Sequence, residues 1–290
     1  MNPYDLLIAP FADFEFMRRA LVGGVAIGLA AAPVGVILML RRMSLTGDAM
    51  AHAILPGAAL GYLVAGLSLP AMTFGGILAG SLVAISAGLV ARFTALKEDA
   101  SLAAFYLISL ALGVTLVSLK GSNVDLLHVL FGTVLALDDA ALILLAAIAT
   151  VTLVTLALLY RPLVLECVDP IFLRSVSRAG GPTHLVFLGL VVLNLVGGFQ
   201  ALGTLLAVGL MMLPAASSRF WSADVTVMIA MASGIGVASA ACGLLLSYHA
   251  ELPAGPAIIL VAGGAYLLSM ALGREGGLVW LALPRKHLEA

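Results

Sequence analysis

The chain has 290 residues, of which 62% are hydrophobic and 10% are charged, with a formal net charge of −1. A soluble domain carries about a quarter of its residues as charged side chains, so this composition excludes a soluble globular protein and indicates a chain that lies in lipid. The two cysteines, Cys167 and Cys242, are far apart in sequence without any CxxC spacing, so neither a disulfide framework nor a thiolate metal site is indicated.

Long apolar stretches follow one another along most of the chain. A bilayer core takes about 20 apolar residues as a helix, and nine stretches of that order occur, the sixth and seventh separated only by Gly197 and Gly198. We therefore predict an all-α fold, a polytopic transmembrane helical bundle of eight or nine helices. The nine predicted spans are residues 20–40, 49–66, 70–91, 100–119, 140–160, 184–196, 199–217, 224–247 and 256–272. Three glycine pairs spaced four residues apart predict close helix packing: Gly24/Gly28, Gly57/Gly61 and Gly76/Gly80.

Lysine and arginine predict the orientation of the bundle, because cytoplasmic loops carry an excess of them. With the loop after Tyr160 inside, 11 of the 14 basic residues fall on the cytoplasmic side, and Arg18, Arg19 and Lys120 fall outside. We expect the N-terminus outside and the C-terminus inside. Residues 1–19 lack the basic and apolar regions of a signal peptide, so we expect an extracytoplasmic segment there, a membrane domain over 20–272, and a cytoplasmic tail over 273–290.

The stretch RRMSLTGDAMAHAILPG, from Arg41 to Gly57, places Asp48 and His52 four residues apart in an apolar run. Ionisable residues in membrane helices are functional candidates, and positions i and i+4 share a helix face. A carboxylate and an imidazole on one face suit Zn²⁺ or Mn²⁺. Pro56 withholds an amide from the carbonyl of His52 and predicts a bend. The alternative is that Asp48 caps the helix start and that a neighbouring helix satisfies His52.

A second polar region runs from Asn194 to Arg219. It contains Asn194 and Gln200 around the double glycine and Pro214 within the following apolar run. Transporters commonly build binding sites from broken helices at membrane depth, so these residues are candidates for the pathway or a hinge. Ordinary hydrogen bonding between helices explains the same side chains equally well.

The predicted cytoplasmic loop contains a short helix. Asp169 suits its N-cap and Pro170 its first position, while Gly180 to Pro182 end it, which gives a helix of about ten residues. It is either a helix on the membrane surface or a docking element for a cytoplasmic partner. Its candidate contact residues are Asp169, Pro170, Phe172, Arg174, Arg178 and Gly180.

Nucleotide hydrolysis by this chain is excluded. None of the three lysines, Lys97, Lys120 and Lys286, completes a GxxxxGK[ST] phosphate loop, and there is no GxSxG or HExxH motif. The chain is therefore expected not to be an enzyme, and any ATP that drives transport is hydrolysed by another polypeptide.

The stretch RRMSLTGDAMAHAILPGAALGYL closely resembles the signature of the permease subunits of bacterial zinc/manganese ABC importers, a basic pair followed by GD-A-x-x-HA-x-LPG. Three further segments resemble this family in the same order: VDLLHVLFGTVLAL, FQALGTLLAVGLMMLPAASSR and ELPAGPAIILVAGGAYLLS. The resemblance covers about residues 16–270. Ala51 departs from it, since many relatives have serine there, and the tail after Gly273 has no counterpart.

The resemblance implies a permease of the bacterial inner membrane that pairs as a homodimer, docks two ATPase subunits and receives metal from an extracytoplasmic solute-binding protein. Asp48 and His52 fall on the family's GD…H positions, which are implicated in metal passage, and 169–180 falls where the ATPase-contacting element is expected. The chain itself then holds no cofactor and no nucleic acid: metal is its cargo, and ATP binds the partner. Zinc, manganese and iron remain alternatives. So does a stand-alone carrier that uses Asp48 and His52 as a proton relay.

Overall fold

The computed structural model describes residues 3–66, 68–94, 98–119, 134–169, 172–173, 175, 177 and 180–282, and its secondary structure there is entirely helical. Seven helical segments are long and apolar enough to cross a membrane, and two shorter apolar helices complete a set of nine in the described chain. The helices of this set are α3 (Glu15–Leu40), α4 (Ser44–Ala53) with α5 (Leu55–Ala65), α6 (Leu69–Phe93), α7 (Glu98–Leu119), α9 (Asp139–Leu158), α12 (Gly180–Leu202), α13 (Thr204–Arg219), α14 (Val225–Ala250) and α15 (Ala254–Leu272).

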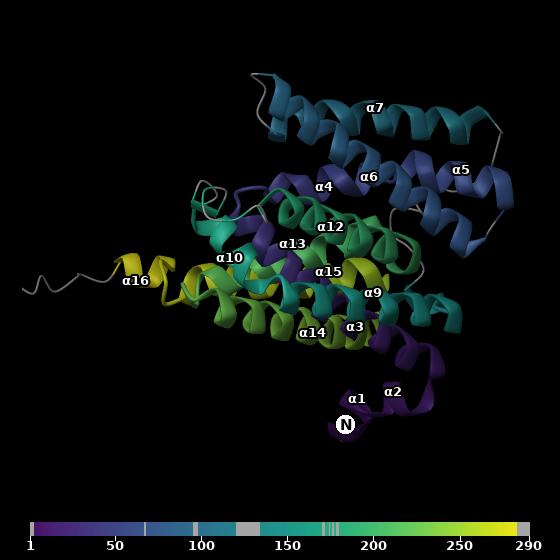
Figure 1. Cartoon of the computed structure of the whole chain (residues 1–290). Helices are drawn as coiled ribbons and strands as arrows, with labels where there is room; N and C mark the ends of the chain where they lie inside the picture. Colours follow the sequence, from purple (N-terminus) through teal and green to yellow (C-terminus); the bar gives the residue numbers. More distant parts are fainter. Residues whose placement is uncertain are drawn as a thin grey trace, which may run out of the picture.

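The remaining helical segments are short. They are α1 (Pro3–Leu7), α2 (Ala9–Asp13), the 3-10 turn η1 (Val134–Ala136), α10 (Tyr160–Val168) and α16 (Leu278–Ala282). Figure 1 shows the start of α3 and helix α16 at opposite ends of the bundle, as an odd number of crossings requires. The predicted all-α bundle is confirmed, and the described residues contain seven candidate membrane spans and two shorter apolar helices.

The helices form two groups joined by a middle layer. On one side α5, α6 and α7 pack against one another, and on the other α3 packs with α13 and α14, and α13 and α14 pack with α15 (Figure 1). Helices α4 and α12 contact members of both groups. The side chains at their crossings form the main core, which includes the fully buried Met50, Ile54, Phe187 and Leu195. Helix α4, which carries Asp48 and His52, is therefore held by the middle of the bundle.

The close helix packing predicted at the glycine pairs is present. A Cβ on Gly28 would lie 3.1 Å from the carbonyl carbon of Gly236, and one on Gly57 would lie 1.9 Å from the carbonyl oxygen of Gly75. The other members, Gly24, Gly61, Gly76 and Gly80, meet neighbouring helices at similarly short distances. These crossings have no space for a side chain at the glycine positions.

The boundary between the sixth and seventh spans differs from the prediction. Helix α12 continues through Gly197 and Gly198 and ends at Leu202, and the break falls at Gly203. A Cβ on Gly197 would lie 2.4 Å from the Ile148 side chain, and one on Gly198 would lie 2.5 Å from Ala207. The double glycine therefore serves packing. Gly203 has φ 92° and ψ 159°, a conformation essentially reserved for glycine, and it turns the chain into α13.

Two further boundaries differ. The helix predicted from residue 20 begins at Glu15, so Arg18 and Arg19 belong to its first turns. The Arg18 side chain donates to the carbonyl of Ala12 at 2.8 Å and so joins α3 to the N-terminal helices. After Tyr160 the chain forms the helix α10 instead of entering a loop directly.

Candidate metal site

A tight turn between α3 and α4 sets the position of Asp48. The amide of Met43 donates to the carbonyl of Leu38 at 2.9 Å, and that of Arg42 to Met39 at 3.0 Å. Arg42 has φ 60°, so the turn is a Schellman motif with arginine at the left-handed position that usually holds glycine. Helix α4 then begins at Ser44, and its N-cap residue, Met43, makes no side-chain cap. Asp48 lies inside α4, so the interpretation of Asp48 as the helix cap is wrong.

Asp48 and His52 share one face of α4. Asp48 Oδ1 lies 3.8 Å from His52 Nε2, and their side chains are 65% and 31% exposed. Ligand atoms bind Zn²⁺ at about 2.0–2.2 Å, so two atoms on one ion lie about 3–4 Å apart. The His52 ring lies beside Tyr106 of α7, with ring centroids 6.2 Å apart. The pair can therefore contact one divalent ion with little side-chain movement.

The pair is an incomplete site within one chain. Among the described residues no group of three or more His, Cys, Asp and Glu side chains is placed to hold a metal ion. On the preceding turn Leu45 is 79% exposed, so this face of α4 is open. Further ligands for an ion held there have to come from water or from another surface.

The helix is interrupted close to Pro56, where the sequence predicts a bend. Helix α4 ends at Ala53 and α5 starts at Leu55, with Pro56 buried in its first turn. Proline has no N–H, and the amide of Ile54 is shared between the carbonyls of Met50 and His52. The hydroxyl of Ser109 on α7 donates to the Ala53 carbonyl at 2.9 Å in a buried position. The helix is thus interrupted at Ile54, two residues beyond His52, and α7 supports the interruption.

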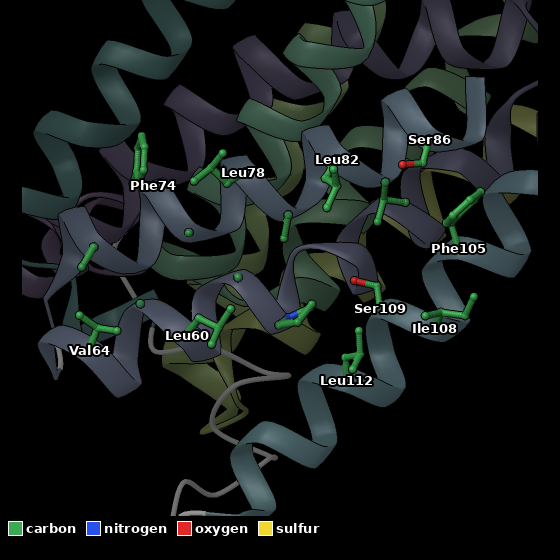
Figure 2. A pocket seen from close by; sticks show the side chains of 17 residues that line it. Leu60, Val64, Phe74, Leu78, Leu82, Ser86, Phe105, Ile108, Ser109 and Leu112 are labelled. Atoms are coloured by element: carbon green, nitrogen blue, oxygen red, sulfur yellow. The ribbon is translucent and has the colours of Figure 1, made fainter. Parts of the chain in front are cut away.

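An apolar groove of about 710 Å³ starts at this bend and runs between α5, α6 and α7 (Figure 2). Its lining contains no charged side chain, and Ser86 and Ser109 are its polar members. Figure 2 shows Leu60, Leu78 and Leu112 among the side chains that line it. Such a groove offers no ligands to a divalent cation, whose desolvation is costly. An ion at Asp48 and His52 therefore has no polar route through this part of the chain.

The candidate residues of the second predicted region, Asn194, Gln200 and Pro214, are not placed with the pair on α4. Asn194 is buried and donates to Thr152 of α9 at 2.8 Å, which is ordinary bonding between helices. Gln200 accepts from Thr73 of α6 at 2.6 Å. Pro214 is buried within α13. Ordinary bonding between helices explains Asn194, whereas Gln200 Nε2 is buried and makes no hydrogen bond to any described residue.

The predicted docking segment is described in part. Asp169 Oδ1 accepts from the amide of Phe172 at 2.8 Å, so the predicted cap is confirmed. The side chain of Phe172 is 51% exposed and that of Leu173 is buried. Gly180 is the first residue of α12 and begins the next span. Pro170, Arg174 and Arg178 lie outside the described residues.

A buried polar cluster beside this segment was missed by the sequence analysis. Arg41 Nη2 lies 2.8 Å from Glu166 Oε1 on α10, with the two side chains 9% and 4% exposed. The same Arg41 nitrogen contacts His184 Nδ1 on α12, and the guanidinium lies 5.1 Å from the ring centre of Phe187. Burial raises the pKa of the neighbouring Cys167 thiol to about 11, and the charge of Arg41 offsets part of that shift. The sequence signal for this cluster was Glu166, a charged residue in a short apolar stretch, but its partners are remote in sequence.

Known transport proteins match the chain along most of its length. Residues 13–273 match the ABC 3 transport family. The chain is 32% identical over 267 residues to the manganese import system permease protein ScaB of Streptococcus parasanguinis, covering 91% of this chain and 94% of the relative. It is 28% identical to the manganese transport system membrane protein MntC of Halalkalibacterium halodurans, covering 96% and 95% of the two chains.

A solved structure gives the same result. A chain of PsaBC from Streptococcus pneumoniae, solved in complex with Fab, superimposes with a TM-score of 0.83 at 29% identity and covers 95% of this chain and 99% of that one. The family match spans most of the sequence, and the fold matches over nearly its whole length. The chain therefore belongs to the ABC 3 transport family.

Proposed function

We propose that this chain is the membrane permease of an ATP-driven importer of divalent transition metal ions, with Mn²⁺ as its cargo. The observation that carries the proposal is the Asp48–His52 pair, whose facing atoms lie 3.8 Å apart on an open helix face. Carboxylate and imidazole ligands suit Mn²⁺ as well as Zn²⁺. Manganese is favoured because the relatives are named as manganese import proteins.

The pair binds its ion transiently. Two side-chain ligands leave most of a coordination shell open, and a transport site has to release what it binds. A homodimer that brings two such faces together would supply four ligands and a path between the copies. The exposure of Asp48, His52 and Leu45 in the single chain supports this arrangement.

Two further partners belong to the proposal. A separate ATPase hydrolyses ATP, because the sequence has no phosphate loop of its own. The segment after α10, with its exposed Phe172, contacts that ATPase on the cytoplasmic side. An extracytoplasmic solute-binding protein delivers the ion at the other end of the bundle, and the chain itself needs no cofactor. The complex lies in the bacterial cytoplasmic membrane.

Membership of the ABC 3 transport family argues against the alternative of a stand-alone proton-coupled carrier. In such a carrier Asp48 and His52 would relay protons, and the purified chain would transport alone. An ABC permease needs its ATPase partner for every cycle.

Substitutions at the pair test the site. We expect Asp48→Asn and His52→Ala each to lower ATP-dependent ⁵⁴Mn²⁺ uptake into proteoliposomes at least tenfold, because the first replaces a charged carboxylate ligand by a neutral amide and the second removes the imidazole ligand. Asp139→Asn is the control, since Asp139 is an exposed aspartate that pairs with Arg19 outside α4, and uptake should stay within twofold of wild type. Normal uptake by both pair variants, in assembled complexes, would exclude Asp48 and His52 as the metal site.

A further inference from the structure

The Arg41–Glu166 ion pair has no part in the metal site, although it is among the most buried charged contacts in the described chain. We propose that this pair is the link through which movement of the ATPase-contacting segment reaches the helix that carries Asp48 and His52. The inference rests on the proposed function and assigns Arg41 and Glu166 as positioning residues for transport.

Arg41 contacts residues that flank the ATPase-contacting segment on both sides, Glu166 on α10 and His184 on α12. Glu166 lies three residues before Asp169, where the segment starts, and its carboxylate is 2.8 Å from the arginine. His184 lies four residues after Gly180, where the segment has ended, and its Nδ1 contacts the same guanidinium nitrogen. A displacement of the segment relative to α3 therefore changes the surroundings of one side chain.

Arg41 is also connected directly to the metal site. It is the C-cap residue of α3, and the closed turn through Arg42 and Met43 leads at once into α4. Asp48 follows seven residues after Arg41. Because the turn is hydrogen-bonded internally, a shift of Arg41 is transmitted to the start of α4 and is not absorbed by a loose loop.

The pair makes one of the two contacts that an arginine and a carboxylate can form. Arg41 Nη1 and Glu166 Oε2 are buried and make no hydrogen bond to any described residue, so one contact joins two groups that could form two. Arginine and carboxylate commonly pair through two parallel hydrogen bonds. A small rotation of the carboxylate would give that second geometry. Buried groups left unpaired are costly, so the two arrangements differ in energy and either can be favoured by movement of α10.

The test separates a role in coupling the ATPase to transport from a role in stabilising the fold alone. An apolar pair of similar size, Arg41→Met with Glu166→Leu, removes both charges together and leaves no lone buried charge. The reconstituted complex is assayed for ⁵⁴Mn²⁺ imported per ATP hydrolysed and for its unfolding temperature. We expect ATP hydrolysis and the unfolding temperature to be retained and Mn²⁺ imported per ATP to fall at least tenfold. Arg19→Gln, which removes a half-buried arginine with two acidic partners outside the cluster, should leave the ratio unchanged.

A wild-type ratio in the folded double variant would overturn the link. If the double variant does not assemble, Glu166→Gln decides: it keeps the volume and one acceptor but removes the charge, and we expect the ratio to fall at least threefold, whereas an unchanged ratio overturns the link. The proposed function fails separately, because in that case the wild-type complex imports no Mn²⁺ on addition of ATP.

Discussion

Asp48 and His52 leave most of the coordination shell of a bound ion open to groups outside α4. Their placement on one face follows from the spacing of four residues, which is why the sequence alone predicts the pair. The rest of the site does not follow from local spacing. Tyr106, which lies beside His52, comes from α7, and Met211 of α13 packs on Gly47 next to Asp48. Both contacts join residues that are distant in sequence, and nothing in the sequence pattern distinguishes Tyr106 or Met211 from an ordinary core residue.

Cys167 provides a test at the residue scale. Its pKa is raised to about 11 because burial disfavours the thiolate, so the folded chain keeps the thiol proton in the range between the ordinary value of 9.0 and about 11. Stability from this group is present below pH 9.0 and is lost as the pH rises through about 11. We expect a Cys242→Ser chain to react slowly with iodoacetamide at pH 8 and faster towards pH 11, by mass spectrometry.

The unfolded chain is the control for this prediction. In denaturant Cys167 should label at pH 8 at the rate of an ordinary thiol. Equal rates in the folded and unfolded chains would mean that burial does not protect the thiol.

At the scale of single elements, the glycines show how tertiary contacts override a local pattern. The sequence places two adjacent glycines at 197 and 198 and a single one at 203, and the double glycine is the stronger helix-breaking signal. The helix nevertheless continues through the pair, because Ile148 and Ala207 pack against it. The neighbours that decide this are distant in sequence, so the boundary could not be predicted from the segment itself.

The backbone at Gly203 gives a second prediction. Its positive φ with extended ψ is a conformation that costs a residue with a Cβ about 1–3 kcal/mol, so Gly203→Ala should lower stability by that amount. Gly189→Ala in α12 is the matched control. A Cβ there meets no atom within 4 Å, and alanine is favoured over glycine in a helix by about 0.5–1 kcal/mol. Thermal unfolding in detergent should move in opposite directions, and a shift of the same sign for both would contradict this account.

The interruption between α4 and α5 gives a third prediction. Ser109→Ala removes the buried donor to the Ala53 carbonyl and leaves that oxygen unpaired, at a cost of about 1–3 kcal/mol. Thr150→Ala is the control, because its exposed hydroxyl bonds only within its own helix, to the carbonyl of Ala146. We expect the serine variant to unfold at the lower temperature. Equal unfolding temperatures would mean that α7 does not support the bend.

At the scale of the whole molecule, the fold was largely predictable, because each spanning helix is a run of apolar residues that can be recognised from its own sequence. All nine predicted ranges correspond to apolar helices in the described chain. The buried cluster of Arg41, Glu166 and His184 was not predictable. Glu166 is 125 residues and His184 is 143 residues from Arg41, so only the packing of α3, α10 and α12 brings the three side chains together. The segment between α10 and α12 was predicted from the helix cap at Asp169. The cluster of buried side chains beside it is visible only in the folded structure.

Metal uptake by the reconstituted complex tests the central claim most directly. The chain is placed in proteoliposomes alone or with its ATPase, and ⁵⁴Mn²⁺ entry is followed with ATP, without ATP, and with a pH gradient across the membrane. The proposed permease predicts uptake only with the ATPase and ATP, lost in Asp48→Asn and His52→Ala and kept in Asp139→Asn. Uptake by the chain alone, driven by the pH gradient, would contradict it.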